Sequence, residues 1–142
     1  MRPQKQKIVN NKYGDCFAAC IASILELPIE VIPNDHSPNY HFTYTSFLGQ
    51  FGLTLECDSP KGAIWKPHPW IASVKSLNYS EGIHSIVMHD GGLVLFDPST
   101  KKRYKTGEIL LGKNIVVAGW DFAIQDFSKL ENLQKYREQL GY

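Results

Sequence analysis

The stretch DCFAACIASILEL, residues 15–27, decides the fold. Its large apolar residues recur at helical spacing and alanines fill other positions, so it predicts a helix from about Cys16 to Leu27 that is apolar on nearly every side. Such a helix is typical of a protein interior rather than of a surface. Pro28 follows and ends it, because proline is poorly tolerated inside a helix.

Cys16 stands at the first turn of this predicted helix, directly after a polar loop at residues 10–15. Unpaired backbone N–H groups and the helix dipole at this end favour a thiolate, which is the nucleophilic form of cysteine. We therefore predict that Cys16 is a nucleophile. Cys20 and Cys57 are interpreted as small apolar side chains, and the same plain role is the alternative for Cys16.

The composition predicts a single globular domain over residues 1–142, with residues 1–7 as a flexible terminus. Hydrophobic residues make up 43% and charged residues 20%, and the net charge is +1. This balance argues against nucleic-acid or membrane binding driven by bulk charge. No secretory signal is visible and no stretch approaches the roughly 18 apolar residues of a membrane helix. Three cysteines, an odd number, indicate free thiols and a cytoplasmic location.

The remaining elements follow from changes in periodicity along the chain. A short turn is expected at 28–33 and a second helix at 40–51, ended by Gly52. Expected strands are 53–57, 70–74, 83–89, 93–96 and 115–124, the third and fourth joined as a hairpin. A capping-box pattern at Ser128 and Glu131 predicts a last helix that ends at Gly141. Helices, then an antiparallel sheet, then a helix make an α+β fold.

A cysteine nucleophile needs a base, and usually a third group that orients the base. The five histidines are His36, His41, His68, His84 and His89. We predict His84 as the base, because it begins the first strand of the hairpin and the return strand ends at Asp97, close to it across the hairpin. A carboxylate there would fix the imidazole tautomer and support the imidazolium. The plain alternatives are a structural histidine and a turn-forming aspartate before Pro98.

Together these residues resemble the papain-like cysteine peptidases. Asp15-Cys16 before an alanine-rich helix, Gly82-Ile83-His84 and Asp97-Pro98 are most similar to the leader-peptide-cleaving peptidases of bacterial ABC exporters. The resemblance implies a papain-like fold that cleaves a peptide or isopeptide bond through a Cys16 thioester, with no metal or organic cofactor. It also implies that Asn10, where the family has glutamine, supplies an oxyanion-hole donor beside the Cys16 N–H. The Cys16 segment is also similar to small uncharacterised phage and bacterial proteins, for which the compartment would be the host cytoplasm.

Two other functions use the same residues. Asn10 in place of glutamine, and Phe17 where the family has glycine after the cysteine, support a catalytically inactive binding module for a peptide, a partner protein or a small anionic ligand. If phage-encoded, such a module would inhibit a host protein. The other alternative is amidase or transglutaminase-like acyl transfer, which differs only in the acceptor.

Three weaker patterns complete the set. Cys16 and Cys20 lie one helical turn apart and could join histidines around zinc, but paired Cys-x-x-Cys knuckles are absent from the sequence. Trp65 and Trp70, among prolines, fit a substrate groove or the core, and the core is the preferred interpretation. The basic run at 101–105 predicts a solvated surface, with an anionic partner as the alternative.

Overall fold

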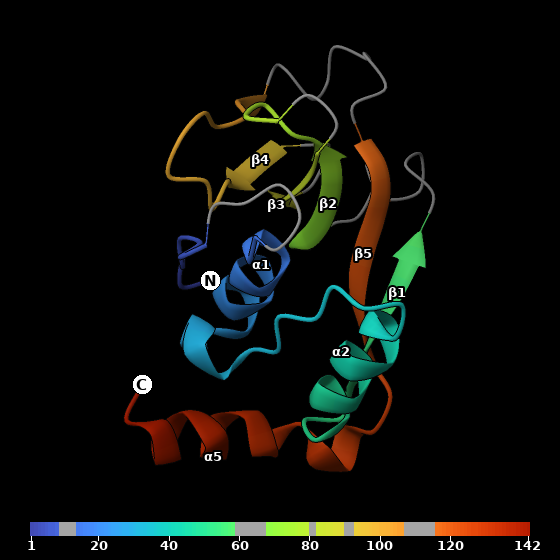
Figure 1. Cartoon of the computed structure of the whole chain (residues 1–142). Coiled ribbons are helices and arrows are strands. Elements are labelled where there is room, and N and C mark those ends of the chain that lie inside the picture. The colour runs from blue at the N-terminus through green and yellow to red at the C-terminus, as the bar shows by residue number, and fades with distance from the viewer. Residues whose placement is uncertain (9–13, 59–67, 80–81, 90–92, 107–115) are drawn as a thin grey trace.

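The computed structural model of the chain describes residues 1–8, 14–58, 68–79, 82–89, 93–106 and 116–142. Within these ranges two α-helices precede the strands and another follows them, which is the α+β order that the sequence predicts (Figure 1). In chain order, with η for a 3-10 turn, the elements are α1 (Cys16–Leu25), η1 (Ile29–Val31), α2 (Tyr40–Gly49), β1 (Leu53–Asp58), β2 (Trp70–Lys75), β3 (Ile83–His89), β4 (Leu93–Phe96), β5 (Val116–Ile124), η3 (Phe127–Lys129) and α5 (Glu131–Leu140).

The described strands form one antiparallel sheet in the order β1-β5-β2-β3-β4. The hairpin β3–β4 forms where the alternation of apolar residues predicts it, with a register shift between Val87 and Met88. The turn predicted at 90–92 lies outside the described residues. Strand β5 lies between β1 and β2, and β2 in turn pairs with β3 of the hairpin.

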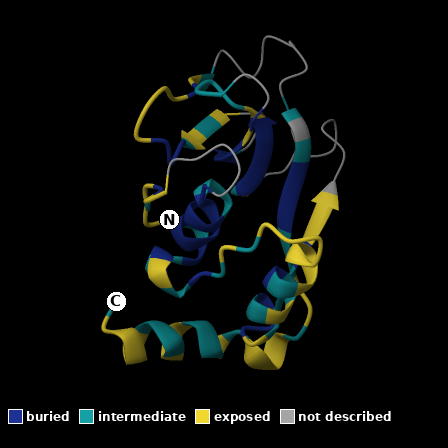
Figure 2. Cartoon of the chain, in the orientation of Figure 1, coloured by how far each residue is buried: buried dark blue, intermediate teal, exposed yellow. Residues whose placement is uncertain are grey.

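Both faces of the central strands are covered. Helices α1 and α2 lie on one face (Figure 1), where Ile71, Val87 and Trp120 pack with them in the main core. A second cluster fills the opposite face, and its buried members are Trp70, Ala72, Val74, Ile86, Met88 and Tyr104. Figure 2 accordingly shows α1 and the central strands as the most deeply buried elements, with more exposure on β4 and α5. Helix α1 and strand β3 therefore belong to the buried centre of the fold.

Helix α1 is buried as predicted, but it ends two residues earlier than expected, at Leu25. Glu26 takes the left-handed conformation that commonly ends a helix, with φ 57°. The carbonyl groups left open at this end accept hydrogen bonds from the Arg137 guanidinium of α5, with Nε at 3.0 Å from the Leu25 oxygen and 3.2 Å from the Glu26 oxygen. These hydrogen bonds connect α5 to the C-terminal end of α1.

The predicted capping box at the C-terminal helix does not form. Helix α5 begins at Glu131, and its N-cap position is Leu130, which has no side-chain cap. The backbone N–H and hydroxyl of Ser128 donate instead to the Asp126 carboxylate, at 3.0 and 2.6 Å. Asp126 competes for the serine because it lies two residues before it, the spacing of an Asx turn, and the result is η3.

The other patterns have mixed outcomes. Trp70 is fully buried in the second cluster, which agrees with a core role, whereas Trp65 lies outside the described residues. Lys101, Lys102 and Arg103 are exposed and form no strand. No helix in the described segments is long and apolar enough to cross a lipid bilayer.

Candidate active site

The start of α1 is fixed by the residue before the thiol. Asp15 is buried, yet its side chain does not cap the helix. Its carboxylate accepts hydrogen bonds from the backbone N–H groups of Lys7, at 3.0 and 3.1 Å, and of Ile8, at 3.0 Å. This interaction holds Cys16, the first residue of the helix, against the N-terminal segment.

The same N-terminal segment reaches the other half of the site. The Gln6 N–H donates to the carbonyl of Pro98 at 3.0 Å, and the Arg2 N–H donates to the carbonyl of Ser23 in α1 at 3.0 Å. Residues 1–7 were expected to be a flexible terminus, but here they bond to α1 and to the turn after β4. The reason is that Ser23 and Pro98 are buried, and a buried backbone carbonyl group needs a hydrogen-bond donor.

His84 and Asp97 lie in direct contact, as the hairpin spacing predicts. His84 Nε2 is 2.6 Å from Asp97 Oδ1, and the two side chains are 9% and 2% exposed. The carboxylate is also held by two backbone donors, the Ser99 N–H to Oδ1 at 2.9 Å and the Tyr104 N–H to Oδ2 at 2.8 Å. Asp97 is therefore fixed by its own turn before it fixes the imidazole.

The imidazole joins this carboxylate to the thiol. The side chains of Cys16 and His84 are hydrogen-bonded, and because Nε2 faces Asp97, the other ring nitrogen, Nδ1, is left for the sulfur. The start of α1 thus supplies the thiol, and the hairpin, far from it in sequence, supplies the imidazole and the carboxylate. Cys16 as a residue is only partly buried.

The pKa values of Cys16 and His84 are shifted in the directions that favour an ion pair between them. Burial alone would raise the pKa of the Cys16 thiol, but the hydrogen bond and charge of His84, assisted by Ser85, outweigh it and lower the pKa below its usual value. Burial alone would lower the pKa of His84, but the hydrogen bonds of Asp97 and Cys16 and their charges raise it to about 9. Both shifts favour the thiolate–imidazolium pair over the neutral thiol and imidazole.

The other two cysteines lack this environment. Cys20 is fully buried, and its burial, followed by the charges of Cys16 and Asp97, raises its thiol pKa well above the usual value. Cys57 is exposed on β1. Cys16 is the cysteine that combines partial access with a hydrogen-bonded imidazole.

Ser85 is a site residue that sequence reasoning missed. Its backbone and its side chain both hydrogen-bond the Cys16 sulfur. Apart from its place next to His84, the sequence offered no signal for it. Its partner across the sheet is Ser73 of β2.

The remaining histidines that the sequence raised lie in other settings. His68 Nε2 is 2.5 Å from Asp121 Oδ1, and His41 Nε2 is 3.2 Å from the Leu55 carbonyl oxygen. Within the described ranges, no three His, Cys, Asp or Glu residues gather where they could hold a metal ion.

The two departures from the peptidase pattern have different outcomes. Asn10, predicted as an oxyanion donor, lies outside the described residues. Phe17 is half-buried and packs edge-on against Tyr44 and Trp120, with ring centroids 5.0 and 5.6 Å away. The phenyl ring therefore turns toward α2 and β5.

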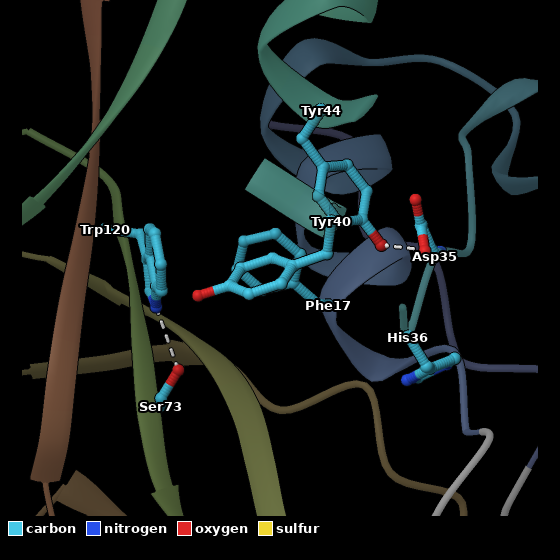
Figure 3. Close-up of a pocket in the computed structure, with 7 residues that line it drawn as sticks. All are labelled: Phe17, Asp35, His36, Tyr40, Tyr44, Ser73 and Trp120. Atoms are coloured by element: carbon cyan, nitrogen blue, oxygen red, sulfur yellow. Dashed lines mark hydrogen bonds between the residues drawn. The ribbon is translucent and has the colours of Figure 1, made fainter. Parts of the chain in front are cut away.

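A pocket of about 300 Å³ opens beside Phe17, and no sequence pattern predicted it. Figure 3 shows Trp120 and Ser73 on one side of it and Asp35 and His36 on the other. Trp120 Nε1 donates to Ser73 Oγ at 3.0 Å, which fixes the indole in the wall. The described lining residues are Phe17, Asp35, His36, Tyr40, Tyr44, Ser73 and Trp120.

In comparisons with known proteins, no protein family matches the chain and no curated protein matches its sequence. The function is therefore inferred from the geometry and electrostatics of the site alone.

Proposed function

We propose that this chain is a papain-like thiol hydrolase that cleaves a peptide or isopeptide bond through a thioester on Cys16. The observation that carries the proposal is the continuous hydrogen-bonded chain from the Cys16 sulfur through His84 to the buried Asp97 carboxylate. A nucleophile, a base and an orienting carboxylate in this order are the requirements of acyl transfer.

The proposed reaction starts from the thiolate–imidazolium pair. The Cys16 sulfur attacks the substrate carbonyl carbon, a C–S bond forms, and negative charge moves to the carbonyl oxygen. The tetrahedral intermediate collapses, the C–N bond breaks, and the His84 imidazolium gives its proton to the departing amine. Water then attacks the thioester while His84 takes its proton. The second tetrahedral intermediate collapses and the C–S bond breaks, so the acid product leaves and the Cys16 thiolate and His84 imidazolium are restored.

The negative oxygen of each intermediate needs donors fixed in advance. The backbone N–H of Cys16 is at the first turn of α1, where N–H groups have no partner within the helix. We assign it as one donor. Asn10 remains the sequence-based candidate for a second.

The test is hydrolysis of a fluorogenic peptide library by the wild type, Cys16→Ala and His84→Ala. We expect turnover by the wild type and loss of at least about 100-fold in each variant, since general acid–base catalysis alone contributes about 10²–10⁴ in rate. Cys57→Ala is the matched control, because Cys57 is exposed on β1, and it should retain wild-type turnover. Equal turnover in wild type and Cys16→Ala would contradict the proposal.

A further inference from the structure

We infer that the pocket beside Phe17 binds a basic side chain of the substrate, arginine in preference to lysine, next to the bond that Cys16 attacks. This assignment rests on the proposed acyl transfer at Cys16 and adds the substrate class. It follows from where the pocket lies, how large it is and which groups line it.

The pocket adjoins the thiol along three separate elements. Phe17 directly follows Cys16 in α1. Ser73 on β2 lies opposite Ser85, whose backbone and side chain hydrogen-bond the Cys16 sulfur. Tyr44 of α2 is close enough for the charge of Cys16 to act on its hydroxyl. A substrate whose carbonyl meets the sulfur would therefore place a neighbouring side chain here.

The volume suits a single side chain. Ligand pockets range from about 300 to 1,000 Å³, so a pocket of about 300 Å³ is at the lower limit. Its walls are aromatic: Phe17 and Tyr40 both stand edge-on to Trp120, at 5.6 and 6.1 Å between ring centroids. Ring faces of this kind pack against an aliphatic stem and attract a cation, and arginine stacks on them better than lysine does.

The described lining includes one carboxylate, that of Asp35, beside the His36 imidazole. Asp35 lies at the side away from Trp120 (Figure 3). Its carboxylate accepts the Ser37 N–H at 2.7 Å and the Thr43 hydroxyl. These hydrogen bonds, with that of Ser37 the largest, lower the pKa of Asp35 and keep it ionised at neutral pH. Among the described lining residues none is Lys or Arg. A basic end would meet a complementary charge there, and an acidic end would be repelled.

The experiment measures how fast peptidyl chloromethyl ketones alkylate Cys16, so it does not depend on turnover. Two series carry Arg, Lys, Ala, Phe or Glu, either at the residue that bears the ketone or at the residue before it. In at least one series we expect arginine to react about tenfold faster than alanine, and glutamate more slowly than alanine. Peptide mapping by mass spectrometry assigns the adduct to Cys16.

Two variants distinguish the contribution of the Asp35 charge from that of the aromatic rings that line the pocket. Asp35→Asn keeps the acceptor for the Ser37 N–H and removes the charge, so the arginine-to-alanine ratio should fall by about threefold to fivefold. Asp126→Asn is the matched control, because Asp126 also accepts a serine N–H two residues on and lies outside the pocket lining, and it should leave the ratio unchanged. Tyr40→Ala, at a 40% exposed position, should slow the arginine and phenylalanine probes but not the alanine probe.

Two results would overturn the inference. One is equal rates for arginine and alanine in both series, and the other is a preference for phenylalanine that Asp35→Asn does not change. Iodoacetamide, which needs no pocket, separates this failure from failure of the proposed function. If it alkylates Cys16 in a His84-dependent way while the peptidyl probes show no preference, the activated thiolate stands and only the basic-substrate assignment is wrong. If its reaction with Cys16 is independent of His84, the proposed function fails as well.

Discussion

Replacing Asp97 with asparagine removes a charge from the site while nearly preserving its shape. The carboxylate is surrounded by donors: His84 Nε2 at 2.6 Å, the Ser99 N–H at 2.9 Å and the Tyr104 N–H at 2.8 Å. An amide offers one oxygen and one NH₂ group, so one of these donors would then face another donor. We expect the imidazole to lose both its hydrogen bond to an anion and its neighbouring charge.

The size of the effect follows from the His84 pKa. Asp97 is the largest contributor that raises this pKa from 6.5 to about 9, a difference equivalent to about 3 kcal/mol. Most of that shift should disappear in Asp97→Asn. The Cys16 pKa should rise in consequence, because the charge of His84 is among the causes that lower it. The unsatisfied donor should also cost about 1–3 kcal/mol of unfolding free energy.

The assay is the rate of Cys16 carboxamidomethylation at pH 7, followed by peptide mapping, together with NMR titration of the His84 ring. Asp97→Asn should slow alkylation by about tenfold or more and move the His84 titration below about 8. Asp121→Asn is the matched control, since it alters a second His–Asp contact, that with His68, and should change neither readout. A His84 titration unchanged in Asp97→Asn, in a protein shown to be folded by circular dichroism, would refute the reasoning.

Four further predictions concern the pH dependence of hydrolysis, the pH dependence of stability, the close contact at Gly52 and the Arg137 contact with α1. Peptide hydrolysis should decline as pH rises through about 9, where His84 loses the proton it gives to the leaving amine, and a pH–rate profile still rising above 10 would contradict this. Because the pKa of His84 is raised in the folded state, its contribution to stability is full below pH 6.5 and is lost as pH rises through about 9. The thermal unfolding temperatures of wild type and His84→Gln should therefore differ most at low pH and converge above about pH 9. Gly52→Ala should lower the unfolding free energy by at least about 2 kcal/mol in urea, because φ is +72° and a Cβ would lie 2.0 Å from the Asp126 backbone oxygen. Gly49→Ala is the control and should change the unfolding free energy little, because a Cβ there has nothing within 4 Å. Equal urea midpoints for the two variants would count against this contact. Arg137→Ala should destabilise the chain by about 1–3 kcal/mol, since it opens the Leu25 and Glu26 carbonyls, and an unchanged urea midpoint would show that this cap is dispensable.

The sequence predicted those parts of the fold that depend on local periodicity. The buried helix at Cys16, the hairpin and the α+β order all follow from spacing and turn residues, which act over a few positions. The contact between His84 and Asp97 was predictable for the same reason, because a hairpin converts short sequence separation into proximity.

What the sequence could not supply depends on long-range packing. The N-terminal residues pair with acceptors that exist only once Ser23 and Pro98 are in place. The pocket needs α1, α2, β2 and β5 to meet, and no local pattern states that Trp120 will face Phe17. The capping box failed because Asp126, two residues before Ser128, competes for the same serine.

The central claim is that Cys16 is acylated with the help of His84. Its most direct test is intact-mass measurement after acid quenching of the protein mixed with an activated peptide ester. We predict a single acyl adduct that maps to Cys16, is absent in Cys16→Ala and forms at least about 100-fold more slowly in His84→Ala. An adduct that forms equally fast without His84, or no adduct on Cys16 in the wild type, would contradict the account.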